Sequence, residues 1–455
     1  MTTQAKPHEL SAAQAAAAIR EGRLSPVELV EALLARIDAY EPALKAWVTV
    51  DRDGALAAAQ ASAEELERAG PRGPLHGVPV GLKDIFYTGG LLTTAGSPLM
   101  ADFVPEYDAH SVAKFREAGA IVLGKTVTTE FADGDPSITY NPWDREHTPG
   151  GSSSGSGAAV AAGMVAVATG SQTVGSTLRP SIYTGIVGLK PTHGRISAYG
   201  LVPVSFSTDT VGIMVRTVED AGLVLDAIAG YDPKDPMGAC QMVGAYHAAS
   251  LRQGRPPRIG LVRQFFYERA DEEIRRQTDD VAQKLAAAGA TVEEATLPEL
   301  FNRSPEDIGA VVWTEAAVFH REWYERNPED YGPNIRSRIR DALARSPLDY
   351  IVALDARREL RAGMADVYGE YDVLLSPGTP GPAPRDRSTT GPTYFQAPWT
   401  WLGCPAINIP TGLAENGMPL GVQLAAGMFQ EERLLTAAAW CERVLGVRLT
   451  PIDPR

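Results

Sequence analysis

Cysteine, long apolar runs and basic residues are all scarce in this sequence of 455 residues. Its cysteines, Cys240, Cys404 and Cys441, lie far apart and lack C-x-x-C spacing, which excludes a disulfide framework and a thiolate zinc site. No run approaches the roughly 18 apolar residues of a membrane span, and the N-terminus lacks the apolar segment of a secretory signal. We therefore expect a protein of the reducing cytoplasm.

The charge balance is acidic, with 42 Lys and Arg against 56 Asp and Glu and a formal net charge of −14. Surfaces that bind nucleic acid or anionic membranes gather Lys and Arg, so we expect neither partner. A hydrophobic content of 44% and a charged content of 22% are ordinary for a folded protein. The sequence thus predicts a globular chain with a solvated acidic surface.

Short apolar segments alternate with helical patterns along the chain. Capping boxes at Ser11 and Ser25 predict two helices that end near Gly22 and Pro42. A third, Ala-rich helix is expected over about 54–69, and later segments predict strands at 77–82, 120–123, 258–262, 290–293, 406–409 and 421–424 and helices at 109–118, 272–288 and 431–445. This alternation predicts an α/β fold with a largely parallel or mixed sheet.

No long linker divides the chain, so we expect one large domain over residues 1–455. It comprises an N-terminal helical layer (1–70), a core that carries the candidate site (71–215), and the remaining sheet, helices and pocket loops (216–455). The long irregular segment Ser376–Pro398 predicts a pocket wall. Four aromatic residues at its end suit either that wall or the core: Tyr394, Phe395, Trp399 and Trp401.

Two Ser/Gly clusters between Thr148 and Ser181 flank the apolar run Ala158–Ala168. A flexible linker would stay rich in Gly and Ser throughout, whereas an apolar run needs burial. The clusters are therefore predicted to be loops held by a packed element. Small residues let the backbone approach a ligand closely and point its N–H groups at it, so we expect a polar pocket with several hydroxyls.

Two familiar motifs occur without the context that they require. Gly119–Thr126 matches G-x-x-x-x-G-K-[ST], but its four spacer residues form the predicted strand itself, whereas a phosphate loop follows a strand. Gly151–Gly155 matches G-x-S-x-G, but polar and kinked residues precede it where a nucleophile elbow needs a hydrophobic strand. A Ser-His-Asp triad is also disfavoured, because the histidines are scattered: His8, His76, His110, His147, His193, His247 and His320.

Lysine can activate a serine without histidine, provided that burial keeps the amine neutral. Lys83 directly follows the apolar segment V-P-V-G-L, so it is a candidate base. A lysine that reaches solvent or pairs with Asp84 explains the same placement equally well.

Seven strings occur in order along most of the chain: L-H-G-V-P-V-G-L-K-D (75–84), T-T-A-G-S (93–97), A-G-A-I-V-L-G-K-T (118–126), T-P-G-G-S-S-S-G-S (148–156), G-S-Q-T-V-G-S-T-L-R-P (170–180), G-L-K-P-T-H-G-R-I-S (188–197) and D-T-V-G (209–212). Their order and spacing resemble those of the amidase signature family of Ser-Ser-Lys hydrolases. The resemblance implies a central mixed sheet sandwiched between helices.

The resemblance also implies a role for particular residues. The family's base falls on Lys83, its bridging serine, which sits in an unusual cis peptide, on Ser152, and its nucleophile on Ser176. Neutral Lys83 would take a proton from Ser152, which takes one from Ser176, without a metal or an organic cofactor. The oxyanion hole would be formed by the backbone N–H groups of Thr173, Val174, Gly175 and Ser176.

The nucleophile loop departs from the commonest family pattern, D-T-G-G-S-I-R-x-P. Gln172 replaces Asp, Val174 replaces the first Gly, and Leu178 and Arg179 occupy the second and third positions after the nucleophile. The Cβ of Val174 restricts the backbone at an oxyanion position. Arg179 could recognise a substrate carboxylate by bidentate pairing or brace the loop through backbone carbonyls.

The resemblance implies hydrolysis of a small linear amide through an acyl-enzyme, with carbamates (urethanes) and aryl esters open to the same relay. The alternative is the A-type subunit of a tRNA-dependent amidotransferase, which needs a partner protein. Gln172 and Leu178 count against that alternative, because its glutamine-specific members resemble the Asp-containing pattern. The oligomeric state, a homodimer included, stays open.

Overall fold

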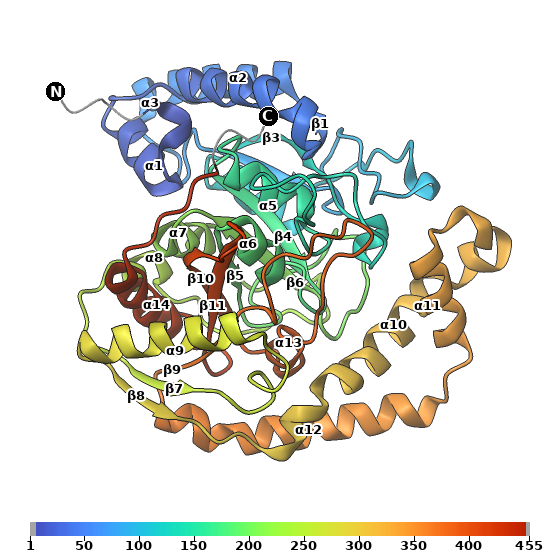
Figure 1. The fold of residues 1–455 in the computed structure, drawn as a ribbon. Coiled ribbons are helices and arrows are strands. Elements are labelled where there is room, and N and C mark those ends of the chain that lie inside the picture. Colours follow the sequence, from blue (N-terminus) through green and yellow to red (C-terminus); the bar gives the residue numbers. More distant parts are fainter. Residues whose placement is uncertain (1–5, 452–455) are drawn as a thin grey trace.

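One 11-stranded sheet runs through the computed structural model, which describes residues 6–451 (Figure 1). Its strand order is β1-β3-β2-β4-β6-β5-β10-β11-β9-β7-β8. The strands are β1 (Trp47–Val50), β2 (Pro79–Lys83), β3 (Ile121–Thr126), β4 (Val167–Gln172), β5 (Val187–Lys190), β6 (Thr210–Val215), β7 (Arg258–Leu261), β8 (Thr291–Glu294), β9 (Val373–Pro377), β10 (Ala406–Leu413) and β11 (Pro419–Ala425).

The sheet is mixed, and its parallel part positions the candidate site. Strand β2 is parallel to both of its neighbours, β3 and β4, whereas β4 to β11 in the middle of the sheet pair antiparallel. Parallel neighbours end at the same edge of a sheet. Lys83 ends β2 and Gln172 ends β4, so the lysine and the start of the nucleophile loop converge at one edge.

Helices flank both faces of this sheet (Figure 1). Helices α5 and α6 contact each other and β2 to β6. Helices α7, α8 and α14 contact one another, and α7 and α14 contact the strands from the other face. The α-helices are α1 (Ala12–Arg20), α2 (Pro26–Leu44), α3 (Arg52–Ala69), α4 (His110–Glu117), α5 (Ser154–Ala161), α6 (Leu178–Thr184), α7 (Val218–Ile228), α8 (Tyr246–Leu251), α9 (Glu272–Ala287), α10 (Ser304–Arg326), α11 (Pro333–Leu343), α12 (Pro347–Glu370), α13 (Ala397–Leu402) and α14 (Glu431–Leu445). Short 3₁₀ helices are η1 (Pro7–Glu9), η2 (Pro98–Met100), η3 (Glu130–Ala132), η4 (Glu299–Arg303) and η5 (Pro328–Asp330).

The predicted α/β fold, a mixed sheet between helices, is confirmed. Both capping boxes form as expected: Ser11 pairs with Gln14, and Ser25 with Glu28. Helix α2 nevertheless continues past Pro42 to Leu44. The N-terminal segment also contributes the edge strand β1 to the sheet, so residues 1–70 are more than the helical layer that was expected.

The apolar run Ala158–Ala168 is not one element. Helix α5 takes up its first residues together with the end of the first Ser/Gly cluster, and β4 begins only at Val167. The small residues serve close packing: a Cβ on Gly155 would lie 2.4 Å from the backbone oxygen of Ala46. The cluster is therefore a loop only up to Ser153 and a helix from there on.

Helices α10 to α12 form an arm between β8 and β9 that extends away from the sheet at the lower right of Figure 1. The junction of α10 and α11 docks on the segment 130–135, where Glu130 accepts a hydrogen bond from Gly332 N and Asp135 caps the start of α11. The Phe131 ring packs edge-on against the His320 ring, with 4.6 Å between the ring centroids. Phe131 has a left-handed φ of 46°, a conformation that persists only where contacts of this kind enforce it.

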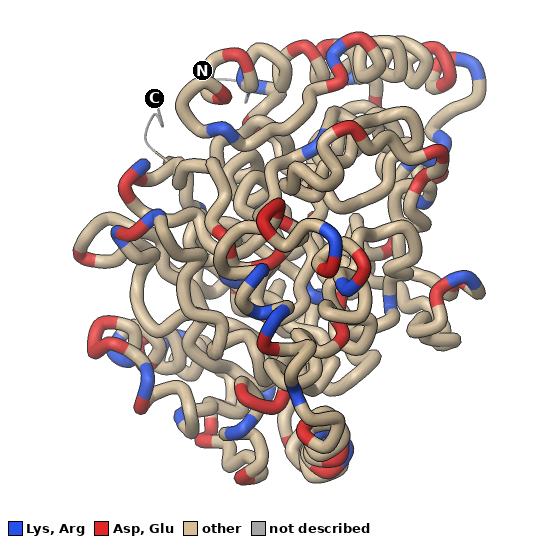
Figure 2. The backbone as a smooth tube through the Cα atoms, turned by 90° about the vertical axis from the view of Figure 1, so that its right-hand side faces the viewer, with Lys and Arg blue, Asp and Glu red and all other residues tan. Residues whose placement is uncertain are grey.

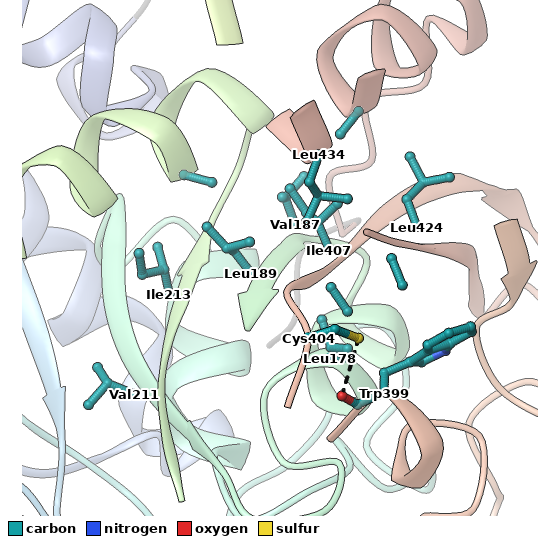
Figure 3. Close-up of a cluster of buried hydrophobic side chains, with 14 of the residues drawn as sticks. Leu178, Val187, Leu189, Val211, Ile213, Trp399, Cys404, Ile407, Leu424 and Leu434 are labelled. Atoms are coloured by element: carbon teal, nitrogen blue, oxygen red, sulfur yellow. Dashed lines mark hydrogen bonds between the residues drawn. The ribbon is translucent and has the colours of Figure 1, made fainter. Parts of the chain in front are cut away.

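The central core lies where the antiparallel strands meet α6, α13 and α14. Figure 3 shows it with Leu178, Val187, Leu189, Val211, Ile213, Trp399, Cys404, Ile407, Leu424 and Leu434. Phe395, Trp399 and Trp401 are 0% exposed. Of the two interpretations of these aromatics, the core is therefore right for these three, and only the half-buried Tyr394 could line a pocket.

Lys and Arg alternate with Asp and Glu along the outer helices in the view of Figure 2. Across residues 6–451, no helix is both long and apolar enough to cross a membrane. The same residues contain no cluster of three or more His, Cys, Asp or Glu side chains arranged to hold a metal ion.

Candidate active site

Lys83 points from the end of β2 into the protein and meets two serine hydroxyls. Its Nζ lies 2.6 Å from Ser152 Oγ and 2.8 Å from Ser171 Oγ. The side chain is 0% exposed. Burial lowers the pKa of Lys83 well below its ordinary value, and only the more distant charge of Asp209 opposes this shift. A neutral amine next to a serine hydroxyl is the arrangement that a lysine base requires.

The alternative that Lys83 pairs with Asp84 is wrong. The Asp84 carboxylate turns the other way, where Thr94 donates to it and Lys125 Nζ lies 3.4 Å from Oδ1. Lys125 belongs to the rejected phosphate-loop motif, whose spacer residues do form strand β3. The lysine of that motif is thus buried in an ion pair and not held in a flexible loop.

Ser152 follows two glycines that let its loop lie against the backbone of the predicted nucleophile. Gly150 and Gly151 have φ values of 81° and 62°, a backbone conformation that residues with a side chain rarely adopt. A Cβ on Gly151 would stand 2.7 Å from Pro180 Cδ and 3.2 Å from Ser176 Cα. The expectation of a cis peptide at Ser152 is wrong for this structure, because every peptide bond between residues 6 and 451 is trans.

Ser176 is half-buried in the loop between β4 and α6. The structure brings its backbone next to Gly151, but the Ser176 hydroxyl makes no hydrogen bond to Ser152 or to any other described residue. Lys83 and Ser152 are therefore in contact, and Ser176 is adjacent to the pair. Hydrogen bonds between catalytic groups are often completed only when substrate is bound.

The N–H groups of Thr173, Val174, Gly175 and Ser176 donate no backbone hydrogen bond within residues 6–451. They are therefore unpaired in the described chain, and the oxyanion hole predicted for them stays a prediction. Val174 has a negative φ, so its Cβ does not strain the loop as the sequence suggested. Gly175 has little space, because a Cβ there would lie 3.0 Å from Gln396 Oε1.

Gln172 organises both ends of this loop. Its Oε1 accepts hydrogen bonds from Thr177 N at 3.0 Å and Leu178 N at 2.9 Å, and so caps helix α6. Its Nε2 donates to Thr400 Oγ1, which in turn donates to the carbonyl of Val174 at 2.7 Å. An aspartate could accept in the same way but has no donor for Thr400.

Arg179 is 2% exposed and makes a single hydrogen bond, from Nη2 to Thr390 Oγ1 at 3.3 Å. Its Nε and Nη1 have no partner in the described chain, and no described carboxylate pairs with it. Burial lowers the pKa of Arg179 to about 10. The bracing of backbone carbonyls is therefore absent.

Three further serines of the first cluster brace the site. Ser153 Oγ accepts from Ser171 N, Ser154 bonds Ser137, and Ser156 donates to Thr169 O. Sequence reasoning missed Ser171 as a contact of Lys83. The alternating Thr169 and Ser171 in the buried strand β4 were the available signal, since residues at this spacing share one face.

A family model described as Amidase matches residues 28–435. The chain belongs to the amidase family. This agrees with the resemblance seen in the sequence, and the fold is that of an amidase-family enzyme acting on amide C–N bonds.

Named relatives cover nearly the whole chain. The A-type subunit of glutamyl-tRNA(Gln) amidotransferase from Geobacter sp. (strain M21) is 35% identical and spans 93% of this chain and 95% of its own. The solved peptide amidase of Stenotrophomonas maltophilia has a TM-score of 0.86 at 31% identity and covers 98% of this chain and 99% of that one. A second solved chain, from a vestigial protein complex said to reveal the evolutionary origins of an s-triazine catabolic enzyme, has a TM-score of 0.92 at 29% identity, covering 97% and 100%.

These names differ in what they favour. The curated relatives carry the name of the amidotransferase component, which was the alternative in the sequence analysis, whereas a solved neighbour is a peptide amidase. Gln172 and Leu178 did not prevent the match to the amidotransferase relatives. The names thus support the alternative better than the free-standing hydrolase.

Proposed function

We propose that this chain cleaves linear amide C–N bonds through a serine acyl-enzyme, with Lys83 as base, Ser152 as proton relay and Ser176 as nucleophile. The observation that carries the proposal is the fully buried Lys83 amine, 2.6 Å from the Ser152 hydroxyl and without a carboxylate partner. A lysine in this setting is neutral enough to accept a proton near neutral pH.

In the proposed reaction, Ser176 Oγ attacks the amide carbonyl while its proton passes to Ser152 Oγ and the Ser152 proton passes to Lys83 Nζ. The carbonyl becomes an oxyanion facing the free N–H groups of residues 173–176. The same relay returns a proton to the leaving nitrogen, the C–N bond breaks, and the acyl group stays on Ser176. Water then attacks the acyl-enzyme through the same relay and releases the acid.

The same attack and oxyanion stabilisation would serve carbamates and aryl esters. We further propose that the preferred substrate carries a carboxylate, because Arg179, three residues after Ser176, is a buried guanidinium whose Nε and Nη1 have no partner in the described chain. A buried charge without a partner is costly, and a carboxylate would balance it.

A second proposal is that the chain is the A-type subunit of a tRNA-dependent amidotransferase. The names of its curated relatives favour it, over nearly the full length of both chains. The first half-reaction, formation of the acyl-enzyme and release of ammonia, would be the same. The two proposals differ in whether a partner protein and charged tRNA are needed.

The test uses the purified full chain alone, on short aliphatic amides, aryl amides, dicarboxylic half-amides, glutamine and carbamates. We expect turnover without a partner, a preference for the half-amides that is lost in Arg179→Met, and a fluorophosphonate adduct on Ser176 that is absent from Ser176→Ala. Activity only with a partner and charged tRNA would establish the amidotransferase instead. An adduct on another serine would refute the assigned nucleophile.

A further inference from the structure

Asp209 lies directly beyond the end of the strand pair that carries the nucleophile loop. The last backbone pair of β4 and β6 joins Gln172 to Thr210, so Asp209 and Thr173 face each other where the ladder stops. Thr173 Oγ1 donates to Asp209 Oδ1 at 2.5 Å. The hydrogen bond between Thr173 and Asp209 thus continues the pairing of β4 and β6 by one residue. Thr173 also carries the first of the four unpaired N–H groups.

The second carboxylate oxygen of Asp209 binds the backbone of the 204–209 loop. Asp209 Oδ2 accepts hydrogen bonds from Val204 N at 2.8 Å and Ser205 N at 2.9 Å. The aspartate therefore joins the 204–209 loop to the start of the nucleophile loop through three hydrogen bonds. Charge-assisted bonds of this kind are among the stronger ones in proteins.

The charges around Asp209 come from several elements. Lys83 approaches from β2 and Glu315 from α10, while His193, Lys234 and Asp235 line the same cavity of about 140 Å³ that Asp209 lines. No described Lys or Arg forms a direct ion pair with Asp209; Glu315 is occupied by Ser205, Ser207 and Tyr350. The charge of Asp209 thus acts on Lys83 from a distance and not by contact.

We propose that Asp209 is a positioning residue of the amide-cleaving reaction, which fixes Thr173 at the entrance of the oxyanion loop and holds a negative charge within electrostatic reach of Lys83. This inference rests on the proposed function. The two roles have separate consequences, because one concerns a hydrogen bond and the other a charge.

The charge of Asp209 affects the reaction through the pKa of Lys83. A carboxylate nearby favours the protonated amine and so raises the pKa of Lys83, against the larger lowering that burial causes. The base is active only when neutral, so activity rises with pH through that pKa. Burial raises the pKa of Asp209 itself to about 6, so its charge is present above that pH. Removing the charge should lower the pKa of Lys83 further, and the acid limb of the pH–rate profile should move to lower pH.

The test is the pH profile of kcat/KM for the full chain and three variants. In Asp209→Asn we expect a plateau about tenfold lower, because the single amide oxygen cannot accept hydrogen bonds from both Thr173 and the 204–205 backbone. We also expect its acid limb to lie lower by about half a pH unit or more. Thr173→Val removes the hydroxyl and keeps the charge, so its plateau should fall with the limb unmoved. Asp209→Glu should return the limb to its wild-type position.

The charge role is overturned if the acid limb of Asp209→Asn coincides with that of the wild type or moves to higher pH. The positioning role is overturned if the plateau of kcat/KM in Thr173→Val is unchanged. If Asp209→Asn does not fold, Asp209→Ser is measured in the same way. Labelling of Ser176 by a fluorophosphonate in the wild-type chain reports on the proposed nucleophile separately. Its absence would refute the proposed function, whatever the profiles show.

Discussion

Lys83 and Lys125 are buried lysines on adjacent parallel strands, and they differ in the groups that surround the amine. In the register of β2 and β3, Leu82 pairs with Lys125 and Lys83 with Thr126, and both lysines are 0% exposed. Lys125 Nζ donates to Phe86 O and Thr93 Oγ1 and lies 3.4 Å from the Asp84 carboxylate. Lys83 contacts hydroxyl groups alone.

Both lysine side chains are fully buried, so burial alone does not explain why the pKa values of the two amines differ. The ion pair with Asp84 limits the fall in the pKa of Lys125, which drops to about 8, whereas the pKa of Lys83 falls well below its ordinary value. Hydroxyls accept a hydrogen bond from an ammonium but carry no charge to balance it. The missing countercharge, and not depth in the protein, distinguishes Lys83 as the proposed base.

Replacing Lys83 should have the largest effect on activity. Lys83→Met removes the proton acceptor and keeps an apolar side chain of similar length, so we expect kcat to fall by about 10³-fold or more while the fold is retained. Initial rates at neutral pH and the melting temperature of the same preparation check this. Near-normal turnover would refute the lysine relay.

Replacing Lys125 should instead affect stability. Lys125→Met leaves the Asp84 carboxylate buried and unpaired, which costs about 3–5 kcal/mol of unfolding free energy. The matched control is Lys125→Met with Asp84→Asn, which removes both charges and should recover much of the loss. Urea unfolding measures both variants; equal stability of wild type and Lys125→Met would show that the ion pair contributes nothing.

The pH dependence of stability should distinguish Lys83 from its apolar replacement. The folded-state pKa of Lys83 is lowered, so between that pKa and the unfolded value near 10.4, unfolding takes up a proton. Stability in this window rises with pH by about 1.4 kcal/mol per unit for one such group. The stability of Lys83→Met relative to wild type should therefore shrink as pH rises, and unfolding curves that stay parallel at all pH values would contradict a neutral Lys83.

The smallest effect is expected at the support of the nucleophile loop. Thr400→Val removes the hydroxyl that holds the Val174 carbonyl and Gln172 Nε2, and should lower kcat about tenfold with little change in KM, since one or two hydrogen bonds are lost. Thr436→Val, at a solvent-side hydroxyl that donates to Ala249 O, is a control distant from the loop. Equal rates in both variants would show that the loop needs no such support.

Local patterns in the sequence were enough for the elements that lie beside the site. The apolar segment before Lys83 predicted a buried strand that delivers the amine, a pattern that depends on neighbours within a few residues. The family resemblance, and not local pattern, named Ser152, which does contact the amine, while the second contact, Ser171, was missed. The mixed sheet followed from the same alternation of strands and helices.

Contacts between distant segments could not be predicted. Thr400 reaches Val174 across 226 residues, and no feature of its own helix marks it as a partner of the nucleophile loop. The arm was missed for another reason: Leu348 and Ile351 in α12 are 69% and 53% exposed, so apolar spacing there does not mark a buried face. The cis peptide came from the resemblance alone, and the structure does not contain it.

The dependence of the nucleophile loop on Thr400 has a consequence for biosynthesis. Lys83, Ser152 and Ser176 are all made in the first part of the chain, but the side chain that holds the loop, and the strand β10 that fills the middle of the sheet, come near its end. A chain still attached to the ribosome therefore carries every reactive group without the means to arrange them. Newly made protein should therefore become competent only when translation is nearly complete.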